Sequence, residues 1–373
     1  MHARLTGATA LLAAALAVAA CDDAADPAPA PASSEPTTST ADELPVGDLG
    51  LDLPAGSSGS VSAVVDGEVV SCDGWGESGC DTVHDIGSVT KQFTAAAVVK
   101  LASQGRLAVT DGLGRWFADV PPDKRDITVR HLLTHTAGLV DALGDDYDPL
   151  DRDAMVAGAL GSRLRSEPGR RYHYSNLGYS LLAAIVEEAS GQDYEAYLRA
   201  ELFEPAGMTR TGYVLPDWDD EEVALEYDAR DRSQGRPFDH PWAEDGPYWN
   251  LRGNGGILST AGDMSRWLAA LDGEAVLDEA AKAELFRPRA QEEPGGSTRY
   301  AYGWVVAEAP FGTVEWHNGG NDWSYAEITR LPGSDVSFFW VTNHVRSRAG
   351  DWDLDRLRPS LTEQLAERLV DPA

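Results

Sequence analysis

Ile86-Gly87-Ser88-Val89-Thr90-Lys91-Gln92-Phe93 is the stretch where a β-rich segment gives way to a strongly apolar helix. Ser88 is predicted in the first turn of that helix with Lys91 three residues later, so the hydroxyl and the amine share one helix face. A lysine can take the proton of a serine nucleophile when burial, or the positive end of a helix, lowers its pKa. The same turn would present the Ser88 backbone N–H to a developing oxyanion. The alternative is a capping serine followed by a surface lysine, but no other lysine of the chain has a serine three residues before it.

Length and composition narrow the class of protein. The chain has 373 residues, 43% of them hydrophobic, which predicts a substantial core in one large domain or two intertwined subdomains. The net charge of −31 argues against a nucleic-acid partner, because phosphates need a basic surface. Such a charge suits a protein outside the cytoplasm or one adapted to salt.

The first residues are typical of an export signal. Leu11 to Ala20 is an apolar run too short to span a bilayer, so residues 1–20 are predicted as a signal peptide. Val18-Ala19-Ala20-Cys21 resembles the bacterial lipobox, in which the cysteine is lipidated and becomes the mature N-terminus. The alternative is an ordinary signal peptide cut after the alanine-rich stretch. Residues 21–48, rich in Asp, Ala, Pro, Ser and Thr, are predicted as a disordered tether. We therefore expect an exported lipoprotein, facing the periplasm or the exterior, that contacts the membrane only through Cys21.

Two further cysteines, Cys72 and Cys80, follow the tether. An exported compartment is oxidising, so a short-loop disulfide between them is plausible. Their spacing fits neither a zinc site nor a redox Cys-x-x-Cys motif.

The periodicity predicts a mixed αβ fold. A hairpin over 61–72, turning at Asp66-Gly67, precedes an apolar helix over 89–104. Residues 111–256 look mainly helical, although 212–250 resist assignment. Period-two segments then follow at 302–308, 313–317, 324–331 and 336–342, and a last helix at about 360–370. We expect residues 49–110 and 257–373 to form one subdomain, an antiparallel sheet flanked by helices, with an all-helical subdomain inserted at 111–256.

Three motifs now stand in order along the chain: Ser88-Val89-Thr90-Lys91, Tyr174-Ser175-Asn176 and His317-Asn318-Gly319-Gly320. Together they resemble the serine β-lactamase and penicillin-recognising hydrolase superfamily, and within it the branch of class C β-lactamases, D-alanyl-D-alanine carboxypeptidases and esterases. The segment from His131 to Leu139 also resembles one common in that branch. The resemblance covers roughly residues 55 to 365 and implies a β-lactamase/transpeptidase-like fold.

The resemblance implies a role for each catalytic residue. Ser88 would attack an acyl carbonyl and become the acyl-enzyme. Lys91 and Tyr174 would share the proton, with Lys91 favouring the tyrosine phenolate and the pair titrating as a unit. Tyr174 would pass the proton to the leaving group and later activate the hydrolytic water.

The resemblance also implies residues that bind the substrate. Asn176 would hold the substrate amide and position Lys91. His317, Asn318 and Gly319 would line the site on a strand, Gly319 letting the substrate lie close, and the Gly320 N–H would be the second oxyanion donor. His317 stands where β-lactamases usually have lysine. A histidine is only partly charged near neutral pH, which disfavours recognition of a carboxylate and favours a carboxypeptidase or esterase over a β-lactamase.

Other candidates have simpler explanations. His131 and His135 have a spacing that could suit a metal, but no third ligand is evident and structural hydrogen bonds are preferred. An acidic loop could bind calcium, but it lacks the spacing of an EF-hand and is better explained as solvated. Several loop aromatics could rim the pocket or simply pack. The residues of the acidic loop are Asp141, Asp145, Asp146 and Asp148. The loop aromatics are Trp242, Tyr248, Trp249, Trp316 and Trp323.

The sequence therefore predicts an exported serine hydrolase that acts through a Ser88 acyl-enzyme without metal or cofactor. Its substrates would be esters, D-amino-acid peptides or amides, or β-lactams, and it is expected to be a monomer. The alternative is a non-hydrolysing ligand-binding or cell-envelope assembly protein with the same fold. A non-hydrolysing protein would be expected to lose Ser88, Lys91 or Tyr174. All three are present, which disfavours that alternative.

Overall fold

The computed structural model describes residues 49–53, 55–309, 312–348 and 352–370. The predicted signal peptide and tether lie outside these residues. Within them, no helix combines the length and the hydropathy that crossing a membrane would require.

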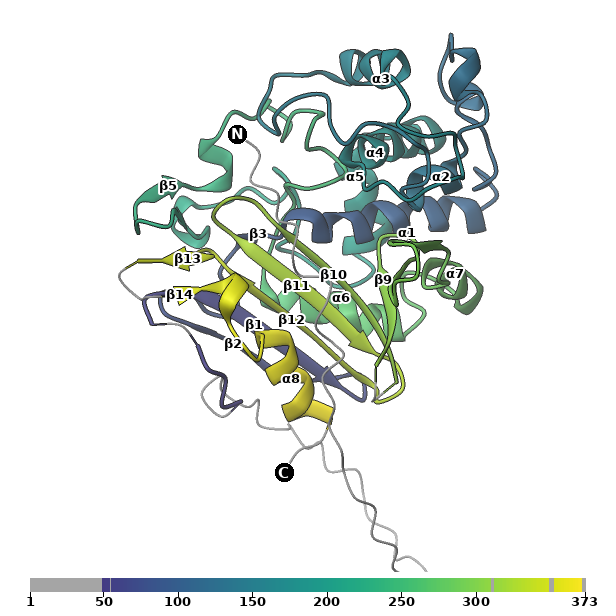
Figure 1. The fold of residues 1–373 in the computed structure, drawn as a ribbon. Coiled ribbons are helices and arrows are strands. Elements are labelled where there is room, and N and C mark those ends of the chain that lie inside the picture. Colours follow the sequence, from purple (N-terminus) through teal and green to yellow (C-terminus); the bar gives the residue numbers. More distant parts are fainter. Residues whose placement is uncertain (1–48, 54, 310–311, 349–351, 371–373) are drawn as a thin grey trace, which may run out of the picture.

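An antiparallel eight-stranded sheet is the centre of the fold (Figure 1). In sheet order the strands are β2 (Glu68–Trp75), β1 (Gly59–Val65), β12 (Val336–Thr342), β11 (Tyr325–Leu331), β10 (Gly312–Gly320), β9 (Val305–Ala309), β8 (Arg299–Tyr300) and β7 (Ala290–Gln291). β1 pairs with β12 from Gly59 opposite Thr342 to Val65 opposite Val336. The predicted sharing of one sheet by the early hairpin and the late strands is confirmed.

The hairpin between β1 and β2 has the predicted turn. Asp66 and Gly67 both have positive φ angles, 51° and 79°, as a type I′ turn requires. This turn matches the right-handed twist of the two strands. The Asp-Gly pair therefore determines the register at which the chain enters the sheet.

Alternation along the strands divides the core into two layers. On β12, Phe338 and Trp340 pack with α8 (Leu361–Val370), whereas Phe339 and Val341 join the larger core on the other face. Figure 1 shows α8 across one face of the sheet and α6 (Ala261–Asp272) behind it. The alternation of side chains along each strand therefore determines which of its residues face the helical side.

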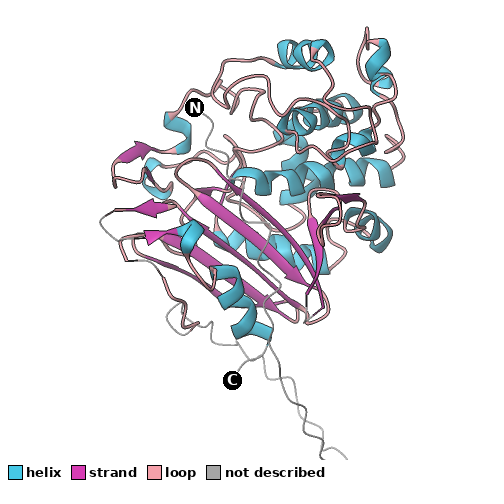
Figure 2. Ribbon diagram, in the orientation of Figure 1, coloured by secondary structure: helices cyan, strands magenta, loops and turns pink. Residues whose placement is uncertain are grey.

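The helical side contains α1 (Thr90–Ser103), which packs on α4 (Asn176–Ser190), α5 (Tyr194–Leu198) and α7 (Glu279–Leu285) (Figures 1 and 2). α1 is buried on nearly every side, as its apolar sequence predicts. The remaining helices are α2 (Val129–Leu133) and α3 (Arg152–Gly161), and the chain after α5 makes a π-helical turn, Arg199–Phe203. α4 ends at Gly191 in the left-handed conformation, with φ of 67°.

In the region 111–256, predicted as an all-helical insertion, most regular elements are helices, but strands occur as well. It contains a two-stranded sheet of β4 (Glu226–Tyr227) and β5 (Ser233–Gly235), within the part that resisted assignment. Another short sheet joins β3 (His84–Asp85) to β6 (Leu258–Ser259), and a third joins β13 (Arg346–Ser347) to β14 (Trp352–Asp353). These strands are too short for a periodic signal in the sequence, so only tertiary pairing reveals them.

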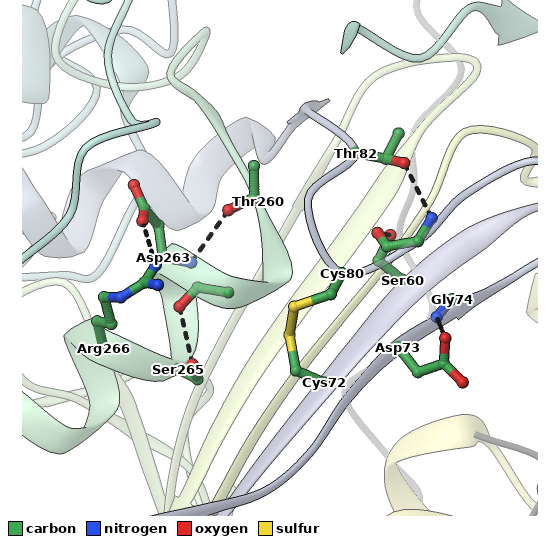
Figure 3. The surroundings of a disulfide bond; sticks show 12 residues. Ser60, Cys72, Asp73, Gly74, Cys80, Thr82, Thr260, Asp263, Ser265 and Arg266 are labelled. Atoms are coloured by element: carbon green, nitrogen blue, oxygen red, sulfur yellow. Dashed lines mark hydrogen bonds and ion pairs between the residues drawn. A yellow bond between two sulfur atoms is a disulfide. The ribbon is translucent and has the colours of Figure 1, made fainter. Parts of the chain in front are cut away.

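Cys72 and Cys80 form a disulfide, with their Cα atoms 5.2 Å apart (Figure 3). The bond ties β2 to the loop that leads into β3. Cys80 also accepts a hydrogen bond through its carbonyl from the Gly262 N–H, in the first turn of α6. The segment just before Ser88 is therefore fixed both to the sheet and to a helix behind it.

Candidate active site

Ser88 lies in a 3₁₀ turn, Gly87–Val89, that leads directly into α1. Gly87 has a positive φ of 50°, and the Asp85 carboxylate accepts the Gly87 N–H at 2.8 Å. Lys91 is fully buried, and its Nζ lies 2.9 Å from Ser88 Oγ, while Ser88 remains partly exposed. The predicted Ser-Lys pair on one helix face is thus present in space.

The surroundings of Lys91 make its amine a suitable base. Burial lowers its pKa to about 7, with the Asp146 and Asp141 charges partly opposing this shift. Nζ also donates to the backbone carbonyl of Asn254 at 2.7 Å. Because that carbonyl takes one amine hydrogen, the lone pair of a neutral amine can point to Ser88 Oγ.

Tyr174 adjoins the same pair. Its side chain is hydrogen-bonded to Ser88, and Lys91 Nζ lies 4.8 Å from the centre of its ring. Burial raises the pKa of Tyr174, and the hydrogen bond with Ser88 only partly opposes that shift. We expected Lys91 to favour the phenolate, and this expectation is wrong in direction: burial dominates and the phenol keeps its proton near neutral pH. Tyr174 is therefore equipped as a proton donor, and Lys91 as the base.

His135 supports Tyr174 from behind, a feature that the sequence did not reveal. The two rings pack at a tilt of 32° with centroids 4.3 Å apart, and His135 Nδ1 accepts the backbone N–H of Ser175 at 3.1 Å. Burial and the Lys91 charge lower the pKa of His135, so the ring is neutral with its proton on Nε2. The sequence analysis expected structural hydrogen bonds for His135 but did not place it beside Tyr174.

His317 is a neutral, fully bonded side chain. Its Nδ1 donates to the Asn318 carbonyl at 2.6 Å, which leaves Nε2 to accept the Tyr300 hydroxyl at 3.0 Å. Burial, with a smaller contribution from Lys91, lowers the pKa of His317 to about 3. The expectation of a partly charged imidazole is therefore wrong, because a cation at this buried position would lose its hydration without gaining an anion.

The end of β10 closes against the turn that carries Ser88. A Cβ on Gly319 would lie 2.3 Å from the Ser88 nitrogen, and one on Gly87 would lie 2.2 Å from the Gly320 nitrogen. The two backbones therefore meet without side chains between them, bringing the Ser88 and Gly320 amides close together. Pairing of β10 with β9 extends only from Gly312 to Trp316, so β9 leaves residues 317–320 uncovered. That edge can receive an extended substrate.

The two asparagines of the motifs are placed differently from expectation. The hydrogen bonds of Lys91 in the described part of the chain go to Ser88 and to Asn254, so Asn254 takes the positioning contact expected of Asn176. Asn176 begins α4, and its buried Oδ1 has no partner among the described residues. Asn318 donates to the Tyr325 hydroxyl at 3.0 Å, because alternation along β10 turns it away from His317.

Asn254 is the site residue that the sequence analysis missed. It is 2% exposed, and its side-chain amide donates to Ser180 Oγ and to the Asn250 carbonyl, which fixes the loop. The flanking Gly253 and Gly256 have positive φ angles of 83° and 77°. A Gly-Asn-Gly-Gly sequence was the one available signal, but its partner Lys91 lies 163 residues away in the chain.

The other candidates resolve into structural roles. His131 caps α2 by accepting the Thr128 N–H at 3.3 Å, a structural hydrogen bond of the kind expected at that residue. Among the described residues, no group of three or more potential ligands is arranged to hold a metal. The four aspartates of the acidic loop are exposed to solvent.

The aromatic residues do not form a common rim. Trp316 packs on the α8 side of the sheet, away from Ser88, and Trp249 lies in the main core. Trp242 packs partly buried against that core. Trp323 stacks on His240 with ring centres 4.7 Å apart.

Comparison with known proteins gives a family for the chain. A protein-family model described as beta-lactamase matches residues 53–359. Penicillin-binding protein 4* of Bacillus subtilis (strain 168) is 29% identical over 255 residues, which cover 64% of this chain and 56% of that protein. Esterase EstB of Burkholderia gladioli is 34% identical over 154 residues, which cover 36% of this chain and 39% of the esterase. The chain thus spans little more than half of the first relative's length.

Solved structures share the fold. The octameric penicillin-binding protein homologue of Pyrococcus abyssi superposes with a TM-score of 0.67 at 26% identity, over 77% of this chain and 69% of that one. The D-amino acid amidase of Ochrobactrum anthropi SV3, in complex with D-phenylalanine, gives 0.68 at 24% identity, over 83% of this chain and 93% of that one. At 24% identity, the similarity to the amidase shows a shared fold and nothing about activity.

Proposed function

The chain belongs to the beta-lactamase family, and on this premise we propose that it is a serine hydrolase that works through an acyl-enzyme on Ser88. The observation that carries the proposal is the 2.9 Å separation of Ser88 Oγ from the buried Lys91 amine, whose pKa is lowered to about 7. A hydroxyl beside an unprotonated amine is an activated nucleophile.

The proposed reaction has two halves. Ser88 Oγ bonds to the substrate carbonyl carbon as its proton passes to Lys91, and the Ser88 and Gly320 amides stabilise the oxyanion. Collapse of that intermediate breaks the bond to the leaving group, which takes a proton from Tyr174, and Lys91 restores the tyrosine proton. Water then gives its proton to Lys91 and attacks the ester carbonyl, and Ser88 leaves with a proton returned from the same pair.

We propose substrates without a carboxylate, namely neutral carboxyl esters and D-amino-acid amides, in preference to β-lactams and to peptides with a free C-terminal carboxylate. The neutral state of His317 supports this choice, because both of its nitrogens are already bonded and neither can offer a positive charge to a carboxylate. Asp141 and Asp146 are close enough to raise the pKa of Lys91, so the site carries a negative field.

The test is covalent labelling with intact-mass detection. A fluorophosphonate should add one adduct to the wild-type chain and none to Ser88→Ala, whereas Ser103→Ala, on the exposed end of the same helix, should label like wild type. Turnover of a p-nitrophenyl ester should fall by about 10³-fold or more in Ser88→Ala. A wild-type chain that takes no label and turns over no ester, D-amino-acid amide or penicillin would overturn the proposal; ligand binding without turnover would then favour the non-hydrolysing alternative.

We also propose that the protein is exported and anchored by lipid on Cys21, with residues 21–48 as a tether to the folded part. Support comes from the apolar run to Ala20 and the Val18-Ala19-Ala20-Cys21 sequence. In a bacterial host with lipoprotein processing, the wild-type chain should partition into detergent and Cys21→Ser into water. Aqueous partition of the wild type would contradict the anchor. The monomeric state also remains our proposal.

A further inference from the structure

The two amides assigned to the oxyanion belong to separate elements of the fold. The Ser88 N–H lies in the turn after β3, and the Gly320 N–H lies at the end of β10. Oxyanion donors act only when their separation is fixed before the charge develops. Asp85 lies three residues before Ser88, and Asn321 directly follows Gly320. The side chains of Asp85 and Asn321 are hydrogen-bonded to each other.

Asp85 joins the two segments through both of its carboxylate oxygens. Oδ1 accepts the Gly87 N–H at 2.8 Å, and Oδ2 accepts the side-chain amide of Asn321 at 3.3 Å. The same Asn321 Nδ2 donates to Glu226 Oε1 at 2.8 Å. One asparagine therefore bridges a carboxylate before the nucleophile and a second carboxylate from β4.

Asn321 is itself held in one orientation. Its Oδ1 accepts the N–H groups of Trp323 and Ser324 at 2.7 and 2.8 Å, and its own N–H donates to the Ser324 carbonyl at 3.1 Å. The turn between β10 and β11 is thus built around this side chain. Gly320, which immediately precedes Asn321, cannot move relative to Asp85 without breaking the turn or the bridge.

Keeping this bridge buried has an energetic cost. Asp85 is 8% exposed and Glu226 is 2% exposed. Burial, with the Glu226 charge, raises the pKa of Asp85 to about 7. Two adjacent buried carboxylates destabilise a fold unless hydrogen bonds offset their lost hydration. A purely structural contact between these segments could be made by apolar side chains at lower cost, so the polar bridge points to a requirement for fixed geometry.

We propose that Asp85, Asn321 and Glu226 are positioning residues that set the separation of the Ser88 and Gly320 amides in the oxyanion hole. This inference rests on the proposed function. None of the three side chains touches the reacting atoms; they act through the backbone of Gly87 and of the turn after Gly320.

The first test is Asn321→Ala against Gln364→Ala. Gln364 is a buried amide side chain of α8, 8% exposed, that accepts the Asp52 N–H and donates to the Pro359 carbonyl on the α8 side of the sheet, away from both oxyanion segments. For a p-nitrophenyl ester, Asn321→Ala should lower kcat by about 10- to 100-fold with KM nearly unchanged, because the lost interaction exists only in the transition state. Gln364→Ala should stay within about threefold of wild type.

A second readout separates positioning from general loss of structure. The ratio of kcat/KM for an ester to that for the matching thionoester reports the fit of oxygen in the oxyanion hole. We expect this ratio to fall in Asn321→Ala and to stay at the wild-type value in Gln364→Ala. If Asn321→Ala does not fold, Asp85→Asn replaces it in the test. The new asparagine can keep the bond to the Gly87 N–H, but it places an amide NH₂ against that of Asn321. The ester-to-thionoester ratio should fall in this variant as well.

Folded variants with wild-type kcat and wild-type ester-to-thionoester ratio would overturn the inference. That failure is distinct from failure of the proposed function, in which the wild-type chain itself would take no fluorophosphonate label.

Discussion

At the scale of single residues, burial decides which groups of the site carry charge. Lys91, Tyr174 and His317 all move away from their ionised forms, because each is removed from water without a counter-ion at hydrogen-bond distance. The same cause suits the lysine to act as a base, keeps the proton on the tyrosine and removes the charge from the histidine. The sequence predicted Lys91 as the base and Tyr174 as a proton donor, but not that Tyr174 keeps its proton and that His317 is neutral.

The lowered pKa of Lys91 predicts a pH dependence. The free amine is the active form, so kcat/KM for a neutral ester should rise with pH through an inflection near pH 7. Lys91→Arg should be inactive across the range, since a guanidinium keeps its proton. The measurement is a pH–rate profile from about pH 5 to about pH 11.5. An inflection near the ordinary lysine pKa of 10.5, or a flat profile, would show that Lys91 is not the base.

The free energy of unfolding should also depend on the protonation of Lys91. Because the folded pKa of Lys91 lies below its unfolded value of 10.5, the unfolded chain binds more protons between about pH 7 and pH 10.5. The Lys91 contribution to the free energy of unfolding therefore becomes more favourable as pH rises through that window.

His317→Lys predicts a change of selectivity. A lysine at this position would offer the cation that the neutral imidazole lacks, and a charge-assisted bond to a carboxylate is worth about 1.5–3 kcal/mol. The rate on a carboxylate-bearing ester relative to its neutral analogue should rise by about tenfold or more. His317→Gln, without a cation, serves as the control and should leave the ratio at the wild-type value. Equal ratios in both variants would exclude His317 from substrate choice.

At the scale of elements, the contact between β10 and the turn at Ser88 is the most demanding packing in the site. Gly319→Ala would place a Cβ 2.3 Å from the Ser88 nitrogen, and backbone cannot give way as a flexible side chain could. We expect fluorophosphonate labelling to slow by about 100-fold or more and stability to fall by about 1–3 kcal/mol.

Gly333→Ala is the matched control for this prediction, because it lies in the turn between β11 and β12 and a Cβ there meets no atom within 4 Å. It should label at the wild-type rate with an unchanged Tm. Labelling of Gly319→Ala at the wild-type rate would show that the two backbones do not meet as described.

Elements with long periodic patterns were predictable. The apolar helix expected over 89–104 is α1, and the last strand expected over 336–342 is β12 with the same bounds. The hairpin was predictable because Asp-Gly encodes its own turn. β3, β4 and β6 have two residues each, and nothing in such short stretches separates a strand from a loop.

At the scale of the whole molecule, the sheet brings the two ends of the fold together. β1 and β12 lie far apart in the chain yet pair along their full length, so the segments carrying Ser88 and His317 belong to one body. The region between them contributes Tyr174 and Asn254 across the helical side. The site therefore exists only when the insertion packs on α1.

The sequence by itself determined the family, the mixed αβ class and the hairpin, and it predicted Ser88, Lys91 and Tyr174 for the site, because local spacing and motif order are properties of the chain alone. Only the tertiary structure decided that Asn254, rather than Asn176, holds Lys91 and that His317 is neutral. It also decided that Asp85 and Asn321 meet beside the nucleophile. These outcomes depend on burial and on contacts between distant segments, and neither quantity is a property of any single stretch of sequence.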